Sequence, residues 1–397
     1  MRPAEAQRII ESLRKGIPPD GYVRNFTVGR ESEIHELTDF LQRGQSGVLL
    51  LKANPGSGKT HLLRFVRETA LAEGFVVSLV TLDSRSSVRF NRMDQIVGAL
   101  LRNLEIPTSN NKGIRPFFDF ICNEIELAKT SNESTKFWER LTNKWRWDYS
   151  DVLDSPALFV ALRAWATGNP IKKSLIEDWL FQPWIYQTQR KRLYKELVET
   201  LRACFRDRRA EWQFYSDGIF IFNQQRYYQC WAVLRDINSL SLSAGLKGLV
   251  LLFDEFEDVI HNLRNISYQQ SAFWNLFEFY SGRQFPGLSF FAVTPDFARK
   301  CKGVLLKKNV WDFDYSRFDQ LPTFEMSPLS TPELKELALK IIETHGLAFG
   351  WEPDLVMRST DFLAMVEQAA ACPVQDRTRY TIKEVVKKLD RLLEDSA

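Results

Sequence analysis

A lysine and a threonine that follow a glycine-containing loop are the strongest candidates for chemistry in this chain. The stretch 49–60 reads Leu-Leu-Leu-Lys-Ala-Asn-Pro-Gly-Ser-Gly-Lys-Thr, and an amphipathic stretch, 61–73, follows it. A strand, a loop and a helix in this order are typical of a phosphate-binding P-loop. Gly56 and Gly58 would let backbone N–H groups converge on an anion, and the helix N-terminus would add its positive dipole.

Each residue type in this motif suits one part of nucleotide binding. Lys59 would contact the outer phosphates as a point charge, and the Thr60 hydroxyl would ligate Mg²⁺. Ala53 stands where the strictest form of the motif has glycine, but alanine is small enough for the end of a strand. An ordinary glycine turn before Lys-Thr is the alternative interpretation. The residues expected to bind the nucleotide here are Asn54, Pro55, Gly56, Ser57, Gly58, Lys59, Thr60 and His61.

An acidic pair at the end of an apolar run is the second candidate site element. Residues 249–253 are apolar without interruption, as expected for a strand buried on both faces, and Asp254 and Glu255 follow them. Asp254 would hold Mg²⁺ through its water shell, and Glu255 would be the general base for the water that attacks the γ-phosphate. A strand that ends in a solvated acidic turn is the alternative. Together with the P-loop, the pair predicts hydrolysis of a Mg²⁺-bound nucleoside triphosphate.

Thr294 is a further catalytic candidate, because it stands at the end of another apolar stretch, 288–293. In ATPases with an extra strand between the P-loop strand and the acidic strand, a polar residue at this position (sensor 1) contacts the γ-phosphate or the attacking water. A threonine that only begins a turn is the alternative interpretation.

The composition is that of an ordinary globular protein. The 397 residues are 44% hydrophobic and 26% charged, which predicts an ample core and two or three structural units. The net charge is only +3, so the chain as a whole has no signature of polyanion binding. Any contact with nucleic acid would therefore need a local basic patch.

Cysteine and histidine usage argues against a disulfide framework and a zinc site. The five cysteines and four histidines are scattered along the chain, without the close spacing of metal ligands, which suits a reducing compartment. The sequence shows neither the apolar core of a signal peptide at its start nor an apolar run of transmembrane length. We therefore expect a soluble, cytoplasmic protein that does not bind membranes.

The order of motifs predicts an α/β P-loop NTPase of the AAA+/ASCE type, with a parallel sheet and a large helical insertion. Residues 1–104 would contain N-terminal helices and the first part of the ATPase core, and 105–245 a mostly helical, tryptophan-rich insertion. Residues 246–328 would complete the core. Residues 329–397 would form a small C-terminal helical lid.

The insertion is rich in residues that can contact nucleic acids. Tryptophans can stack on bases, and arginines and lysines can follow phosphates. The tryptophans are Trp138, Trp145, Trp147, Trp165, Trp179, Trp184, Trp212 and Trp231, and the basic residues are Arg190, Lys191, Arg192, Arg202, Arg206, Arg208 and Arg209. Aromatic residues at helical spacing are more often core, so DNA is a candidate partner and a packed core is the alternative.

A Val-Gly-Arg element precedes the P-loop. Val28, Gly29 and Arg30 open an amphipathic stretch, and they resemble the segment that lies against the nucleotide base in origin-recognition-like AAA+ and STAND ATPases. The resemblance implies that these three residues bind the cofactor. A glycine turn that caps a helix is the alternative interpretation.

Most of the chain resembles the BrxD-like ATP-binding proteins of bacterial BREX phage-exclusion systems, which are AAA+-like P-loop ATPases. The resemblance is carried by residues 8–19 with 28–30, by the P-loop, by 177–180, and by 245–249 leading into 254–257. It implies ATP and Mg²⁺ as cofactors and a role in antiviral defence. It also implies assembly into a homo-oligomer or with other defence proteins.

Two functional hypotheses follow. In the first, ATP hydrolysis drives oligomerisation and remodels DNA or partner proteins, and Arg317 completes a neighbour's site as an arginine finger. In the second, the protein is a slow nucleotide-dependent switch or scaffold that presents a surface to partners. Arg317 would then be an ordinary surface residue. Arg377 and Arg379 are alternative candidates for a lid arginine that reaches the γ-phosphate.

Overall fold

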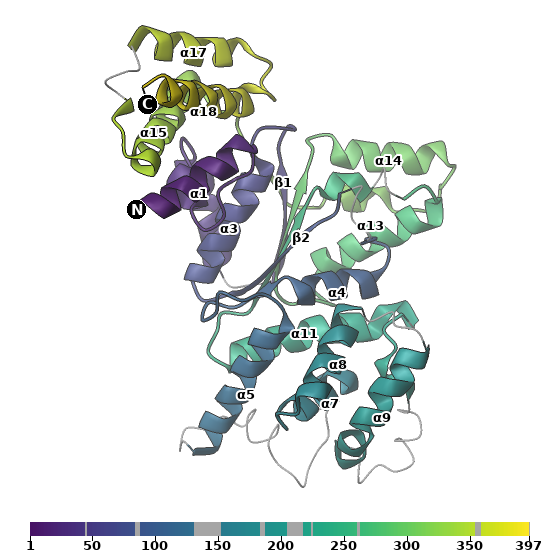
Figure 1. Ribbon diagram of the computed structural model, residues 1–397. Coiled ribbons are helices and arrows are strands. Elements are labelled where there is room, and N and C mark those ends of the chain that lie inside the picture. Colours follow the sequence, from purple (N-terminus) through teal and green to yellow (C-terminus); the bar gives the residue numbers. More distant parts are fainter. Residues whose placement is uncertain are drawn as a thin grey trace.

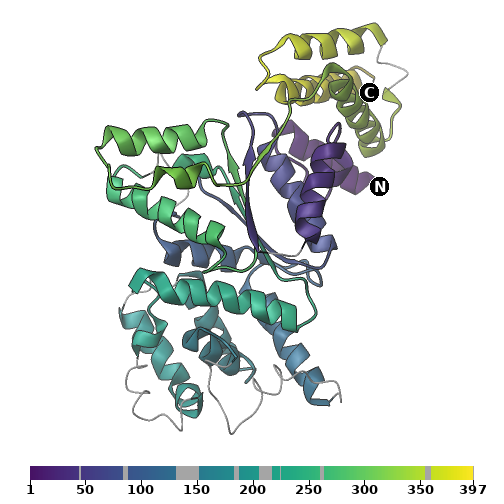
Figure 2. The ribbon, with the colours of Figure 1, turned by 180° about the vertical axis from the view of Figure 1, so that it is seen from behind.

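One sheet forms the centre of the molecule, with helices on both faces and a helical bundle at each end (Figures 1 and 2). The computed structural model describes residues 1–43, 46–83, 88–130, 152–182, 187–204, 217–223, 225–259, 263–353 and 359–396. The C-terminal helices lie at one end of the sheet, and the helices of the insertion lie at the other end (Figure 1). Among the helices described, none is both long and apolar enough to cross a membrane.

The sheet has six strands in the order β3-β2-β4-β5-β1-β6. The strands are β1 (Gly47–Lys52), β2 (Val76–Thr81), β3 (Leu104–Glu105), β4 (Leu249–Asp254), β5 (Leu288–Val293) and β6 (Thr323–Glu325). All pairs are parallel except β2 with β3, so the predicted parallel sheet is in fact a mixed one. Strand β3 pairs antiparallel with β2 through Glu105 and Leu104, although a helix lies between the two strands in the sequence.

Strand β5 lies between β1 and β4. A sensor 1 residue follows a strand in this position, and Thr294 follows β5 directly. Every residue of β4 and β5 is buried, which explains why both strands read as apolar runs rather than as alternating patterns. The arrangement is compatible with a P-loop NTPase.

Helices cover both faces of the sheet. On one face, α2 (Glu31–Gln42) and α3 (Lys59–Ala72) pack on Leu49, Leu51 and their neighbours. On the other face lie α4 (Met93–Arg102), α13 (Ile266–Ser281) and α14 (Phe297–Lys307). Because alternate residues of a strand point to opposite faces, the runs of apolar residues supply both cores.

The insertion is helical over the residues described, as predicted. It contains α5 (Ile114–Thr130), α7 (Pro156–Trp165), α8 (Pro170–Phe181), α9 (Gln187–Cys204) and α11 (Tyr228–Ser243). Short 3₁₀ helices η4 (Asp217–Phe220) and η5 (Gln225–Tyr227) precede α11, and the core contains η1 (Val23–Phe26), η6 (Phe256–Asp258) and η7 (Tyr315–Phe318). The insertion shares one hydrophobic core with a face of the sheet, so it is not a separate globule.

The tryptophans of the insertion that the structure describes are core residues. Trp165 and Trp179 are each 1% exposed and Trp231 is 4% exposed. Trp165 packs edge-on against Phe118, and Trp179 packs against Phe220. The alternative interpretation, that the tryptophans belong to a packed core, is therefore right for Trp165, Trp179 and Trp231. The others, Trp138, Trp145, Trp147, Trp184 and Trp212, lie outside the described residues, as do Arg206, Arg208 and Arg209.

The C-terminal helices form a bundle that includes the first helix of the chain. The helices α15 (Thr331–Phe349), α17 (Ser359–Ala371) and α18 (Arg377–Ser396) pack with α1 (Pro3–Arg14) around a core of their own. Figure 1 shows α1 beside α15 and α18, and both chain ends lie near this bundle. We call α1, α15, α17 and α18 the lid bundle. The sequence did not predict that α1 packs with the lid helices.

A partly buried polar network ties α1 to the lid helices. The His345 Nδ1 atom accepts a hydrogen bond from Trp351 Nε1 at 2.9 Å, so its Nε2–H donates to Asp390 Oδ1 at 3.0 Å. Arg14 donates to both oxygens of Asp390 at 3.0 and 2.6 Å. Because each buried group has a partner, the network fixes how α1, α15 and α18 are oriented.

The packing of α1 predicts that a cavity in this helix loosens the lid bundle. Ile10 is fully buried there, so Ile10→Ala should lower the free energy of unfolding by about 2–5 kcal/mol. Hydrogen exchange should then show faster exchange in α15 and α18. The matched control is Leu339→Ala on α15, where the side chain is 47% exposed and the change should be about 0.5 kcal/mol or less. Unchanged exchange in α15 for Ile10→Ala would mean that α1 does not stabilise the bundle.

Candidate functional site

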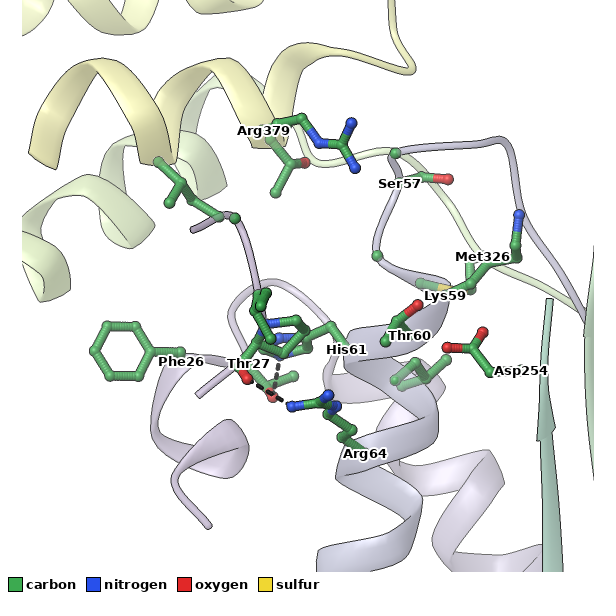
Figure 3. Close-up of a pocket in the computed structure, with 18 of the residues that line it drawn as sticks. Phe26, Thr27, Ser57, Lys59, Thr60, His61, Arg64, Asp254, Met326 and Arg379 are labelled. Carbon is green, nitrogen blue, oxygen red and sulfur yellow. Dashed lines mark hydrogen bonds between the residues drawn. The ribbon is translucent and has the colours of Figure 1, made fainter. Parts of the chain in front are cut away.

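A pocket of about 670 Å³ lies where the carboxyl ends of β1 and β4 face the lid bundle (Figure 3). Its walls come from the glycine loop, the start of α3, the acidic end of β4, the segment 16–30 and α18. The volume falls within the range of pockets that bind nucleotide-sized ligands. The carboxyl ends of parallel strands are also where open α/β sheets bind ligands.

The glycine loop adopts the tight conformation that its sequence predicts. Gly56 and Gly58 have φ values of 80° and 101°, which other residues rarely adopt. Ser57 donates its N–H to Asn54 O at 3.2 Å, so Asn54 acts through its backbone within the turn. Gly58 caps the N-terminus of α3, and the first N–H groups of that helix therefore face the pocket.

The lid bundle presses directly on this loop. A Cβ atom at Gly56 would lie 1.9 Å from the Gln375 carbonyl oxygen, so only glycine fits. Gln375 belongs to the turn that precedes α18. The glycine loop and the lid bundle are therefore in backbone contact, and movement of one must displace the other.

Lys59 is held by a carboxylate that the sequence did not single out as a site residue. Its Nζ atom lies 3.0 Å from Glu257 Oε1 and 3.3 Å from Ala53 O. The Lys59 side chain is 10% exposed, so its charge is largely shielded from solvent. Glu257 was visible in the sequence as the second acid after Asp254, but only the fold brings it to Lys59.

Thr60 and Asp254 meet at the end of β4. Burial raises the pKa of Asp254, and a hydrogen bond from the Thr60 side chain and the charge of Lys59 offset part of that shift. Both side chains offer hard oxygen donors, which suit Mg²⁺. No group of three His, Cys, Asp or Glu residues among those described could hold a metal ion. A Mg²⁺ ion at this position would therefore need further oxygens from a phosphate or from water.

Glu255 has a strained backbone at the mouth of the pocket. Its φ of 54° lies in the left-handed region, which is rare for a residue with a side chain. Its N–H donates to Asp254 Oδ1 at 3.0 Å. Burial and the charges of Asp254 and Asp258 raise the pKa of Glu255, which makes its carboxylate a better proton acceptor.

The other end of the pocket combines apolar side chains with Thr27, His61 and Arg64. Figure 3 shows Phe26, Thr27 and His61 on the side away from Lys59 and Asp254. The His61 Nε2 atom lies 3.0 Å from Thr27 Oγ1. Burial, with the nearby charges of Arg30 and Arg64, lowers the pKa of His61 to about 4. His61 is therefore neutral at physiological pH.

Val28 and Arg30 of the Val-Gly-Arg element line the pocket, but the three residues of the element have different contacts. Val28 lines the pocket and is 5% exposed. Gly29 packs against Glu333, which leaves no space for a side chain. Arg30 donates to Ser57 O at 3.4 Å, to Glu33 at 3.0 Å and to Ser327 O. Arg30 thus connects the glycine loop to Ser327, in the segment between β6 and α15.

The structure separates the two lid arginines. Arg379 lines the pocket and points toward the glycine loop (Figure 3). Arg377 does not line it, and its Nε atom donates to Cys372 O at 3.0 Å within the lid bundle. The sequence offered both residues without a means to choose, because residues two positions apart on one helix face different sides, and the sequence does not show which side faces the pocket.

Thr294 and Arg317 do not line this pocket. The Thr294 side chain is 8% exposed, and its Oγ1 atom is buried without a hydrogen bond of normal geometry to the described residues. Arg317 lies 4.6 Å above the ring of Trp274 and 5.5 Å from that of Phe277. An arginine finger would act on a neighbouring subunit, so the role of Arg317 stays a prediction.

The chain resembles proteins of a bacterial defence system. Residues 1–157 match the family described as BREX system ATP-binding protein BrxC/D. The match confirms the resemblance that the motifs indicated, and it includes the glycine loop, Lys59 and His61. The matched segment contains the glycine loop but not the acidic end of β4. No curated protein and no solved structure shows significant similarity to the chain.

The contact between Lys59 and Glu257 predicts that this carboxylate competes with phosphate. Glu257→Gln would leave the Lys59 charge unneutralised, so ATP without Mg²⁺ should bind about 3- to 10-fold more tightly, on the scale of one ion pair. Isothermal titration calorimetry in the presence of a chelator measures this. Glu73→Gln is the control, because it removes an exposed carboxylate that pairs with Lys247 near the other end of α3. Equal or weaker binding to Glu257→Gln would rule out competition.

Proposed function

We propose that this protein is a Mg²⁺-dependent ATPase of a bacterial phage-exclusion system. The observation that carries the proposal is the convergence of Lys59, Thr60, Asp254 and Glu255 on one pocket. These residues come from two segments almost 200 positions apart in the sequence. The match to a BREX ATP-binding family supports ATP as the ligand and antiviral defence as the setting.

Each of the four residues has a part in hydrolysis. Lys59 would bind the outer phosphates once it leaves Glu257, and Thr60 and Asp254 would hold Mg²⁺, which would supply positive charge to the phosphates. Glu255 accepts a proton from the attacking water, a role that its raised pKa favours. Thr294 would assist from the end of β5, where its hydroxyl oxygen is buried without a hydrogen-bond partner among the described residues.

The lid bundle is the element that would couple nucleotide binding to assembly. Arg379 lines the pocket from α18, and the Gln375 carbonyl touches the glycine loop. A phosphate bound in the loop would attract Arg379 and so shift the bundle. We propose that this motion exposes or forms the surface through which the protein oligomerises and remodels DNA or partner proteins.

A slow nucleotide-dependent switch is the second candidate function, and one observation favours it. Within one chain, Lys59 is paired with a carboxylate and Arg317 lies outside the pocket. A single subunit would then bind ATP but hydrolyse it slowly. A switch must present a surface to partners, and the buried residues Trp165, Trp179 and Trp231 do not contribute to such a surface.

The proposed mechanism predicts different failures for two substitutions. Glu255→Gln should keep ATP binding but abolish turnover, since it removes the base and leaves the phosphate site intact. Lys59→Ala should weaken binding itself, because the phosphates lose a point charge. Binding is measured by calorimetry, and turnover by phosphate release with and without DNA. Lys52→Ala, at the end of β1 but outside the pocket lining, is the control for removal of a lysine. Wild-type turnover by Glu255→Gln would disprove the mechanism.

If Arg317 acts in trans, its loss should affect hydrolysis more than affinity. Arg317→Ala should lower the hydrolysis rate by about 10³-fold or more, as for other arginine fingers, while ATP affinity changes little. Arg299→Ala, an 84% exposed arginine on α14, is the matched control. Light scattering with and without ATP reports the oligomeric state.

A mixture of two inactive variants gives a sharper test of the same role. Arg317→Ala and Glu255→Gln subunits lack different halves of a shared site, so mixed oligomers should recover part of the activity. No recovery, together with a monomer at every ATP concentration, would favour the switch.

A further inference from the structure

We propose that His61 selects adenine over guanine by accepting a hydrogen bond from the exocyclic amino group of the base. The inference rests on the proposed nucleotide site and assigns one residue the choice of base. It follows from the hydrogen bonds around the imidazole ring and from its place in the pocket.

The hydrogen bonds around Thr27 determine which nitrogen of His61 carries the proton. Thr27 Oγ1 lies 2.9 Å from Val23 O and 3.0 Å from His61 Nε2. A carbonyl oxygen can only accept, so the single hydroxyl hydrogen of Thr27 goes to Val23. Both contacts are hydrogen bonds only if His61 Nε2–H donates to Thr27 Oγ1. The ring is then the Nε2–H tautomer, and Nδ1 has a lone pair.

The Nδ1 lone pair has no partner among the residues that the structure describes, and the side chain lines the pocket. It lies at the end away from Lys59 and Asp254, next to Phe26 and Thr27 (Figure 3). With the phosphates at the glycine loop, this is the end left for the base. Apolar residues suited to contact the faces and edges of a purine surround it, namely Ile17, Pro18, Phe26, Val28, Leu337 and Ile382.

Arg64 holds the segment that forms this end of the pocket in place. Arg64 Nη1 donates to Pro18 O at 2.8 Å, which ties the segment 16–30 to α3 one turn after His61 (Figure 3). Glu68 accepts N–H bonds from Val23 and Arg24 at 3.2 and 3.3 Å. The segment that orients Thr27 is therefore attached to the same helix that presents His61.

An acceptor at this position distinguishes purines by their donor pattern. The adenine amino group donates a hydrogen bond, whereas the guanine O6 atom in the same place is an acceptor. Two lone pairs would face each other if guanine entered, and both would lose their bonds to water. A purine that has only a hydrogen atom at C6, in place of the amino group or O6, would leave His61 Nδ1 without a partner. The site should therefore prefer adenine to both.

Competition for a ribose-labelled fluorescent ATP tests this on the wild-type protein. We expect ATP to displace the probe at concentrations about 10-fold or more below GTP and purine riboside triphosphate, since one mismatched buried hydrogen bond is typically that costly.

Two pairs of variants identify the residues responsible. His61→Phe keeps a ring but removes the acceptor, so it should bind ATP and purine riboside triphosphate equally, while His61→Asn should retain part of the preference through its amide oxygen. Thr27→Val removes the group that fixes the tautomer and should reduce the preference, whereas Thr27→Ser keeps the hydroxyl and should preserve it.

The outcomes separate this inference from the proposed function. If wild-type protein binds ATP and purine riboside triphosphate equally, or if His61→Phe keeps the full preference, His61 does not select the base although the ATP site stands. If Thr27→Val and Thr27→Ser behave alike, Thr27 does not orient the ring. If no nucleotide displaces the probe and Lys59→Ala has no effect on its binding, the proposed nucleotide site itself is wrong.

Discussion

The absence of a side chain at Gly56 is the constraint on which the site depends. The Gln375 carbonyl occupies the space that a Cβ atom would need, so the glycine loop and the lid bundle share one contact surface. The pocket exists because the bundle, built from both ends of the chain, lies against this loop. Any ligand that orders the loop must therefore act on the bundle as well, and this links a local binding event to the position of four helices.

The balance of charge inside the pocket is a second constraint, because several acidic side chains line it together with Lys59. Asp254, Glu255, Glu257 and Asp258 are all near one lysine, and burial strengthens the repulsion among the acids. Without a ligand, Glu257 reduces this imbalance by pairing with Lys59. A Mg²⁺-bound nucleotide would bring both the cation that the acids need and the anion that the lysine needs. The site is thus suited to a metal–phosphate pair rather than to either ion alone.

Much of the fold could be predicted from the sequence because local patterns determine it. The apolar runs at 249–253 and 288–293 form β4 and β5, and the glycine loop ends where α3 begins. Strand β3 was not predicted, because two residues are too few to show any periodicity. The packing of α1 with the lid helices was also not predictable, since an amphipathic pattern shows that a face is buried but not which partner covers it.

The sequence by itself determined which residues could bind phosphate and metal, because the spacing of Lys59 and Thr60 after the glycine loop is a local property. Tertiary structure alone decided that Glu257 pairs with Lys59, that Arg379 rather than Arg377 lines the pocket, and that Thr27 bonds to His61. Each of these depends on the direction in which a side chain faces and on a partner tens or hundreds of positions away. Sequence spacing encodes neither the direction nor the partner, because both are fixed only when the lid bundle packs with the segment 16–30 and against the glycine loop.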